Sequence, residues 1–345
     1  MPTLRAEELR TLGTAIFAAL GATSENAAGV MASLIGADLA GHPSHGVLRI
    51  PSYVEEIRAG TLRPAAVPTV THETPATAIV DGAATFGQLG ARLGATLAAQ
   101  KARDLGLGAA ATFGGAHTGR IGEWAEVGAR EGFITFAAAS TAHGAMTVVP
   151  FGGARAALGT NPFAWAIPRA GGEPPILLDY ATSAVARGKL LVARATGKPI
   201  PEGWILDRNG QPSTDVEDFF AGGVLLPFAG HKGYAMAVIA EMLAVGLSGG
   251  QEAPVGEPSN CLFVACFAPA AFGPADRFAE GIERIANRLT EQPPAAGSEG
   301  VLLPGDPEVA SRRERERDGI PLADATWAVI AKIARDLGVA HPALA

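Results

Sequence analysis

The chain is poor in cysteine, in aromatic residues and in charge. It has two cysteines among 345 residues, its aromatic residues make up 6% and its charged residues 18%. Cys261 and Cys266 form neither a zinc-binding pattern nor a disulfide framework, so we expect two small core residues, a reducing cytoplasm and no metal site. Because aromatic residues are scarce, alanine, valine and leucine must fill the core.

The chain also lacks a basic surplus and a long hydrophobic run. Its formal net charge is −7, whereas a nucleic-acid-binding protein needs a basic face. The densest basic run, residues 311–317, alternates with glutamates and predicts a solvated helix. No apolar segment reaches the ~20 residues that cross a bilayer, and the N-terminus shows no signal-peptide core. We therefore expect a cytoplasmic protein with no nucleic-acid or membrane partner.

Segments typical of strands and helices alternate along the chain, which favours an α/β or α+β fold. Periodic apolar residues predict helices near both ends, and strand-like runs begin at Ala76. We expect a helical domain made of residues 1–75 and 300–345. We expect a mixed-sheet region over residues 76–299, which holds the cofactor and the substrate and divides into one or two subdomains.

Local signals predict where several helices begin and end. Ser24 is the expected N-cap of the second helix, which ends at Gly41. Ser44 is the expected N-cap of a third helix, which Pro51 kinks or restarts. The apolar segment 232–247 is expected to form a buried helix.

The usual nucleotide-binding signatures are absent. No G-x-G-x-x-G lies between a strand and a helix, and no G-x-x-x-x-G-K-[ST] occurs. The H-E-x-x-H, G-x-S-x-G and EF-hand patterns are missing too, so zinc proteolysis, α/β-hydrolase chemistry and EF-hand calcium binding have no motif support. If the protein binds a dinucleotide, it does so without the Rossmann phosphate loop.

One short stretch gathers residues suited to acid–base chemistry. His45, Arg49 and Tyr53 follow one another at four-residue steps, and Ser44 precedes the histidine. Histidine exchanges protons near neutral pH, and the guanidinium of arginine binds carboxylates. The set suits a small carboxylic acid whose neighbouring oxygen gains or loses a proton. Spacing alone slightly favours an ordinary capped helix with a surface arginine, and His42 is expected to be a turn residue.

Two glycine-rich bends open predicted helices. His117 and Arg120 lie in the first bend, and His231 and Lys232 lie in the second. Free N–H groups at a helix start bind anions such as phosphate, and these side chains would reinforce that binding. A plain turn into a helix explains each bend equally well.

Several motifs occur in a fixed order over nearly the whole chain: GHPSHGVLRIPSY, ATFGQLGA, AHTGRIGEWAE, PFGGARAALGTNPFAWAIP, LLDYATSAVARGK, LLPFAGHKGYAM and LLPGDPE. Together they resemble the malate/L-lactate dehydrogenase-like family, whose relatives include ureidoglycolate dehydrogenase, sulfolactate dehydrogenase and Δ1-piperideine-2-carboxylate reductase. The resemblance implies a non-Rossmann nicotinamide-binding fold with a mixed, largely antiparallel sheet. It also implies NAD or NADP as the cofactor, and a homodimer with its sites at or near the subunit interface.

The resemblance further implies roles for particular residues. His45 would be the proton donor to the substrate carbonyl or imine, with Ser44 assisting it, and Arg49 would bind the substrate carboxylate. Some relatives instead give the acid–base role to the histidine that matches His117. Two further residues would contact the substrate: Tyr53 and Thr160. The residues implied in cofactor binding are His117, Thr118, Gly119, Arg120, Ile121, Asp179, Tyr180, Ala181, His231, Lys232, Pro304, Gly305 and Asp306.

The resemblance leaves the substrate side chain open. Where the piperideine-carboxylate reductases carry an HGD-like triplet, this chain reads Arg187-Gly188-Lys189, which favours keto acids, although PFAGHKG is closer to the reductases. We predict an enzyme that moves a hydride between nicotinamide and C2 of a small 2-oxo or 2-hydroxy acid. The alternatives are reduction of a cyclic imino acid and, in another class, a non-catalytic small-molecule sensor, against which the presence of both His45 and Arg49 argues.

Overall fold

The computed structural model describes residues 1–144, 146–252 and 256–340, so the last five residues of the predicted 300–345 segment lie outside the described part. Its centre is a seven-stranded sheet in the order β2-β3-β4-β11-β5-β6-β7. Within this sheet β3 and β4 are parallel and every other neighbouring pair is antiparallel, so the predicted mixed, largely antiparallel sheet is confirmed. The strands are β2 (Thr69–Glu73), β3 (Thr77–Asp81), β4 (Leu107–Gly115), β5 (Ile134–Thr141), β6 (Phe163–Ile167), β7 (Ile176–Tyr180) and β11 (Asn260–Phe267).

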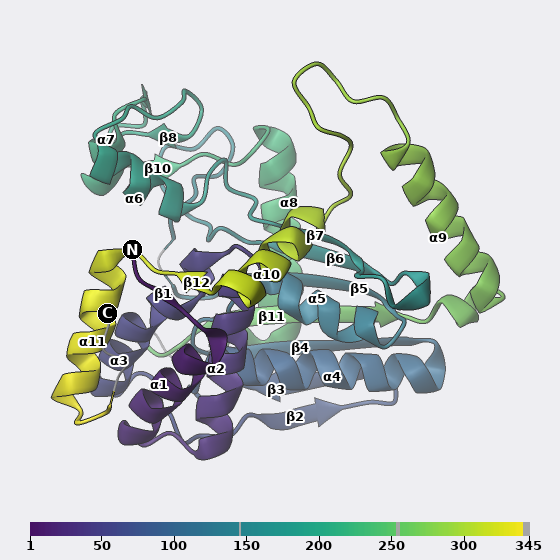
Figure 1. Ribbon diagram of the computed structural model, residues 1–345, viewed down its shortest axis with the longest axis horizontal. Helices are drawn as coiled ribbons and strands as arrows, with labels where there is room; N and C mark the ends of the chain where they lie inside the picture. The colour runs from purple at the N-terminus through teal and green to yellow at the C-terminus, as the bar shows by residue number, and fades with distance from the viewer. Residues whose placement is uncertain (145, 253–255, 341–345) are drawn as a thin grey trace.

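Helices α4 (Gly87–Leu105) and α5 (Ile121–Arg130) cover one face of the sheet, on the near side in Figure 1. The core beneath them is built mainly of alanine, as the scarcity of aromatic residues requires. Gly108 of β4 lets α4 approach closely, because a Cβ atom there would overlap the backbone oxygen of Ala98. The two cysteines lie buried in β11, as expected of small core residues.

The other face of the sheet is only partly covered. Helix α8 (His231–Glu241) and the π-helical turn Met242–Gly246 pack there against a cluster that includes Phe136 and Phe163. The prediction of a buried helix over 232–247 is wrong for one side of this segment, because three large apolar side chains on it are exposed: Ile239, Met242 and Leu247.

The N-terminal helices pack with the last helix of the chain around a core of their own. These helices are α1 (Ala6–Ala19), α2 (Ser24–Leu39), α3 (Ile50–Arg58) and α11 (Asp324–Asp336). Strand β1 (Thr3–Leu4) pairs with β12 (Ile320–Pro321), which ties the start of the chain to its end. Helix α10 (Asp306–Asp318) lies along α2, and its 311–317 segment has no buried residue, as predicted for a solvated helix.

A smaller lobe lies above the sheet in Figure 1. It contains α6 (Arg187–Thr196), α7 (Val216–Phe220) and a three-stranded sheet of β8 (Ile205–Leu206), β9 (Pro212–Ser213) and β10 (Val224–Leu225). Helix α9 (Ala275–Thr290) and the loop after it project from the body of the molecule (Figure 1). None of the helices in the described ranges is long and apolar enough to cross a membrane.

Two predicted helix starts are wrong. Thr23, not Ser24, caps α2, because its hydroxyl accepts a hydrogen bond from the N–H of Asn26 at 3.1 Å. Ser44 caps no helix, since it lies inside the 3-10 turn Pro43–His45, and α3 begins only at Ile50.

Candidate active site

The turn that carries His45 is fastened to α2 by a buried aspartate. The carboxylate of Asp38 accepts a hydrogen bond from the N–H of Val47 at 2.8 Å. Burial raises the pKa of Asp38 to about 7, although this hydrogen bond and the charge of Arg315 lower it. A second 3-10 turn, Val47–Arg49, follows directly and leads into α3. Two tight turns, not one helix face, therefore place the residues of the SHG motif (Ser44-His45-Gly46) and Arg49.

Ser44, His45 and Arg49 come together within these turns. The Ser44 hydroxyl lies 3.0 Å from Nδ1 of His45, and Nε of Arg49 donates to the backbone oxygen of Ser44 at 2.9 Å. The two terminal nitrogens of the Arg49 guanidinium have no hydrogen-bond partner among the described residues, so the fork is free to bind a carboxylate.

His117 joins this group from the end of β4. Its ring stacks on that of His45 with 5.4 Å between ring centroids, and its Nδ1 lies 2.8 Å from the Tyr53 hydroxyl. The same hydroxyl accepts a hydrogen bond from the side-chain amide of Gln88 on α4, also at 2.8 Å. Three segments that are distant in the sequence thus form one polar cluster, which consists of His45, Tyr53, Gln88 and His117.

Both stacked histidines are uncharged at neutral pH. Burial is the main cause that lowers the pKa of His45 to about 3, and the positive charge of Arg49 lowers it further. Burial and the same arginine lower the pKa of His117 well below its ordinary value. A neutral imidazole can accept a proton on one nitrogen and donate a hydrogen bond from the other.

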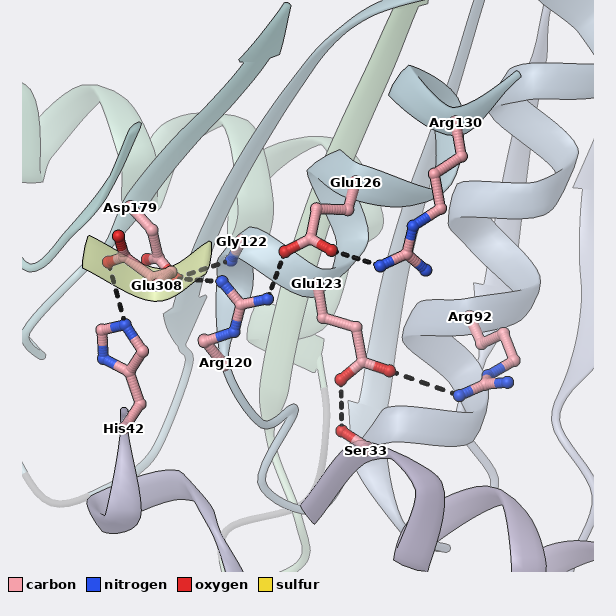
Figure 2. A network of polar contacts seen from close by, with 10 residues as sticks. All are labelled: Ser33, His42, Arg92, Arg120, Gly122, Glu123, Glu126, Arg130, Asp179 and Glu308. Carbon is pink, nitrogen blue, oxygen red and sulfur yellow. Dashed lines mark hydrogen bonds and ion pairs between the residues drawn. The ribbon is translucent and has the colours of Figure 1, made fainter. Parts of the chain in front are cut away.

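Figure 2 shows a network of charged side chains at the start of α5, in which Arg120 and Glu126 are buried. Arg120 forms ion pairs with Glu126 and with Asp179, the latter at 3.6 Å between Nη1 and Oδ2. Arg130 pairs with Glu126 from the more exposed side. Burial acts to lower the pKa of Arg120, but the charges of Glu126 and Asp179 outweigh it and raise the pKa.

Polar contacts around the start of α5 connect it to α2 and α4, and a further contact connects His42 to α10. Glu123 accepts a hydrogen bond from Ser33 on α2 at 2.5 Å and pairs with Arg92 on α4 at 3.3 Å (Figure 2). His42, expected to be only a turn residue, lies 3.2 Å from the carboxylate of Glu308 on α10. These contacts fix the position of the SHG turn relative to α5 and α10.

The predicted cofactor segments 117–121, 179–181 and 304–306 lie around β7 and α5. Asp179 at the end of β7 accepts a hydrogen bond from the N–H of Gly122 at 2.9 Å, and Pro304 accepts one from Leu177 at the other end of the strand. The amide of Gly122 at this helix start is therefore already bound by a carboxylate, contrary to the expectation of free N–H groups. A cleft of about 420 Å³ opens beside Leu177 of β7 and Gly305, and no residue of 117–121 or 179–181 lines it. Its charged lining consists of Glu126, Arg130, Glu173, Glu308, Arg312, Arg313 and Glu316.

Other predicted residues are not in contact with the histidine pair. The backbone oxygen of Thr160 accepts hydrogen bonds from Thr182, which places it at the end of β7. His231 and Lys232 are exposed in the first turn of α8, where the ring of His231 contacts Phe151. Of the Arg187-Gly188-Lys189 triplet, Gly188 lies beside the site, since a Cβ atom on it would lie 3.8 Å from that of Ser44.

Reasoning from the sequence missed Asp38 and Gln88. Asp38 lies at the buried end of α2, and Gln88 lies in the first turn of α4, where both side chains are buried. The available signal for Asp38 was a charged residue inside the apolar pattern of a predicted helix. Gln88 lies in the ATFGQLGA motif, but the motif does not indicate its hydrogen-bond partner.

The chain matches the model of the malate/L-lactate dehydrogenase family over residues 4–331. It is 39% identical to hydroxycarboxylate dehydrogenase B of Escherichia coli K12, over 98% of this chain and 95% of the relative. Its fold matches malate dehydrogenase from Pyrococcus horikoshii with a TM-score of 0.88 at 30% identity, covering 99% and 97% of the two chains. It matches Δ1-piperideine-2-carboxylate reductase from Pseudomonas syringae with a TM-score of 0.82 at 30% identity, covering 97% and 100%. The family resemblance is confirmed, and the chain belongs to the malate/L-lactate dehydrogenase family.

Proposed function

We propose that this protein transfers a hydride between the nicotinamide of NAD or NADP and C2 of a small 2-oxo or 2-hydroxy acid. The observation that carries the proposal is the cluster of Arg49, with its free guanidinium fork, and two neutral histidines stacked 5.4 Å apart. The arginine can bind the substrate carboxylate, and the histidines can exchange a proton with the neighbouring oxygen. The reaction requires both of these from the protein.

Arg49 binds the substrate carboxylate and so fixes C2 and its oxygen beside the histidines. Positioning of this kind lowers the barrier by several kcal/mol. His45 exchanges the proton at the C2 oxygen, and His117 is the second candidate for that role. Because the charge of Arg49 lowers the pKa of His45, a carboxylate bound to Arg49 offsets that effect and makes His45 easier to protonate.

The residues beside α5 fit a phosphate-bearing cofactor. Arg120 is buried and paired with Glu126 and Asp179, whereas Arg312 and Arg313 in the neighbouring cleft have no acidic partner among the described residues. We propose that Arg312 and Arg313, with Asp179 and the 304–306 turn, hold NAD or NADP. When bound, the cofactor supplies or accepts the hydride.

Loss of NADH or NADPH absorbance in the presence of 2-oxo acids tests the reaction class. We expect turnover with at least one acid of a panel that includes oxaloacetate and pyruvate, and with one of the two cofactors more than with the other. If a folded sample turned over no 2-oxo acid and no cyclic imine, this result would contradict the proposal.

A second candidate is the reduction of a cyclic imino acid. The similarity to the Pseudomonas syringae reductase favours it, whereas the Arg187-Gly188-Lys189 triplet beside Ser44 favours keto acids. The same panel separates the two, because an imino-acid reductase turns over Δ1-piperideine-2-carboxylate in preference to any 2-oxo acid.

We also propose that the protein is a cytoplasmic homodimer. Exposed apolar side chains lie along α8 and the turn after it, and Trp165 is exposed on the same face of the sheet. These side chains, Ile239, Met242, Leu247 and Trp165, support a subunit interface that buries them. Helix α9 adds exposed Ile285 and Leu289 on an arm that projects from the body (Figure 1). Light scattering of the purified protein tests this, and a monomer at micromolar concentration would contradict it. Met242→Glu should weaken the dimer.

The separate hydrophobic cores support the division of the chain that the sequence predicts. The core of the N-terminal helices and α11 draws nearly all of its residues from 1–75 and 320–334. The seven-stranded sheet and the smaller lobe have cores of their own, which supports two subdomains within 76–299. We propose these boundaries, and limited proteolysis tests them by cutting first near residues 75 and 300.

A further inference from the structure

We propose that Gln88 and Tyr53 are positioning residues that keep the proton of neutral His117 on Nε2. His117 then serves as a fixed hydrogen-bond donor to the C2 oxygen, and His45 is left as the group that exchanges the proton. The inference rests on the proposed function, and it resolves which of the two histidines exchanges the proton.

The direction of the hydrogen bonds follows from the Gln88 amide. Its Nε2 donates to the Tyr53 oxygen at 2.8 Å, so the phenol proton is free to point at Nδ1 of His117, also at 2.8 Å. Nδ1 then accepts a hydrogen bond, and the single proton of a neutral imidazole lies on Nε2.

The opposite orientation of the amide costs more. As placed, the amide leaves one buried acceptor, Oε1 of Gln88, without a partner. Exchanging the two atoms would leave the NH2 group of Gln88 buried with no acceptor, and unpaired buried donors are rarer in proteins than unpaired acceptors. The Tyr53 hydroxyl also keeps its proton, because burial raises the pKa of Tyr53 above its ordinary value.

The packing of α4 holds this chain of hydrogen bonds in place. Gly87 precedes Gln88, and a Cβ atom there would overlap the backbone oxygen of Ala116, directly before His117. The start of α4 therefore lies against the backbone that carries the histidine. Tyr53 is itself fully buried between Phe17 and Phe86, so its ring has no room to turn away.

The two histidines differ in what holds their Nδ1 atoms. Among the described residues, the hydrogen-bond partner of His45 Nδ1 is the Ser44 hydroxyl at 3.0 Å, which can donate or accept as the imidazole gains or loses a proton. Nδ1 of His117 faces a phenol whose own oxygen is already engaged by Gln88. Nε2 of either ring has no hydrogen-bond partner among the described residues, and neither atom is among the fully enclosed ones. His45 can therefore change protonation with little rearrangement, whereas His117 cannot.

Nitrogen NMR of the protein labelled with ¹⁵N-histidine tests the inference without any turnover. Assignment uses the loss of signals in His117→Asn. We expect Nε2 of His117 to show the shift of a protonated ring nitrogen and Nδ1 that of an unprotonated one at neutral pH. The reverse pattern would overturn the inference, whatever the enzyme's substrate proves to be.

Gln88→Met tests the part played by the amide, with Gln100→Met on the exposed side of the same helix as the matched control. We expect the His117 signals of Gln88→Met to shift towards values averaged between the two tautomers. We expect kcat to fall by roughly 10- to 100-fold with KM little changed, because a misdirected donor weakens binding of the developing charge. Unchanged signals with an unchanged kcat would overturn the role of Gln88.

Discussion

Gly46 lies directly against the carboxylate of Asp38, so closely that a Cβ atom on the glycine would overlap both carboxylate oxygens. Its φ is −90°, so the backbone conformation itself does not require glycine. The missing side chain, not an unusual dihedral angle, is what allows Asp38 to reach the N–H of Val47 and hold the turn that carries His45.

Gly46→Ala should therefore lower both stability and activity. Forcing a methyl group into a filled site costs about 1–3 kcal/mol, and the displaced turn would misplace His45. Urea unfolding and kcat measure the two effects. Gly36→Ala, in α2 with open space around its Cβ position, is the control and should be neutral or stabilising. Equal behaviour of the two variants would contradict the contact.

Arg49→Lys and His45→Ala should affect different kinetic constants. Lysine keeps the charge of Arg49 but loses the planar fork, so KM for the acid should rise by about 10- to 100-fold with a smaller change in kcat. His45→Ala removes the proton-exchanging group, so kcat should fall by ~100-fold or more. Steady-state kinetics distinguish these outcomes. Arg58→Lys, at the exposed end of α3, is the matched control and should leave both constants unchanged.

Between about pH 7 and pH 5, the free energy of unfolding should depend on pH because His45 titrates differently in the folded and the unfolded protein. The unfolded chain protonates this histidine near its ordinary pKa of 6.5, whereas in the folded protein the pKa is about 3. The unfolded state thus binds more protons, and His45 makes stability fall as the pH falls, by up to ~1.4 kcal/mol per pH unit.

Asp38 acts in the opposite sense, because its pKa is raised to about 7 and the folded state takes up its proton first. The difference between wild type and His45→Gln isolates the histidine. Urea unfolding over this pH range should give a shallower loss of stability in the variant, and parallel curves for the two proteins would be inconsistent with a His45 imidazole that stays neutral in the folded protein.

Glu126→Gln should destabilise the fold more than any exposed ion pair does. The substitution removes the nearer of the two carboxylates that pair with the buried Arg120, and breaking a buried ion pair costs about 3 kcal/mol. Glu280→Gln, which removes an exposed ion pair with Arg284, should cost less than about 0.5 kcal/mol. Chemical denaturation compares the two, and similar losses would show that the network in Figure 2 contributes little.

Much of the fold was already determined by local sequence. Periodic apolar residues predicted helices near both ends of the chain, and strand-like apolar runs from Ala76 onward predicted the sheet region, because runs and periods of apolar residues are visible in the local sequence. The ordered motifs, including SHG and HTGRI, determined the family. The absence of a Rossmann glycine pattern agrees with the mixed, largely antiparallel order of the seven-stranded sheet.

The tertiary structure alone decided how the active-site residues meet. His45 and His117 are separated by seventy-two positions, and their stacking depends on how α2 packs against α4, which in turn lies on β4. The helix-face spacing of His45, Arg49 and Tyr53 did not describe their arrangement, because Asp38 and two 3-10 turns set it instead. Hydrogen-bond partners such as Gln88 and Tyr53 are chosen by proximity in space, which no local pattern records.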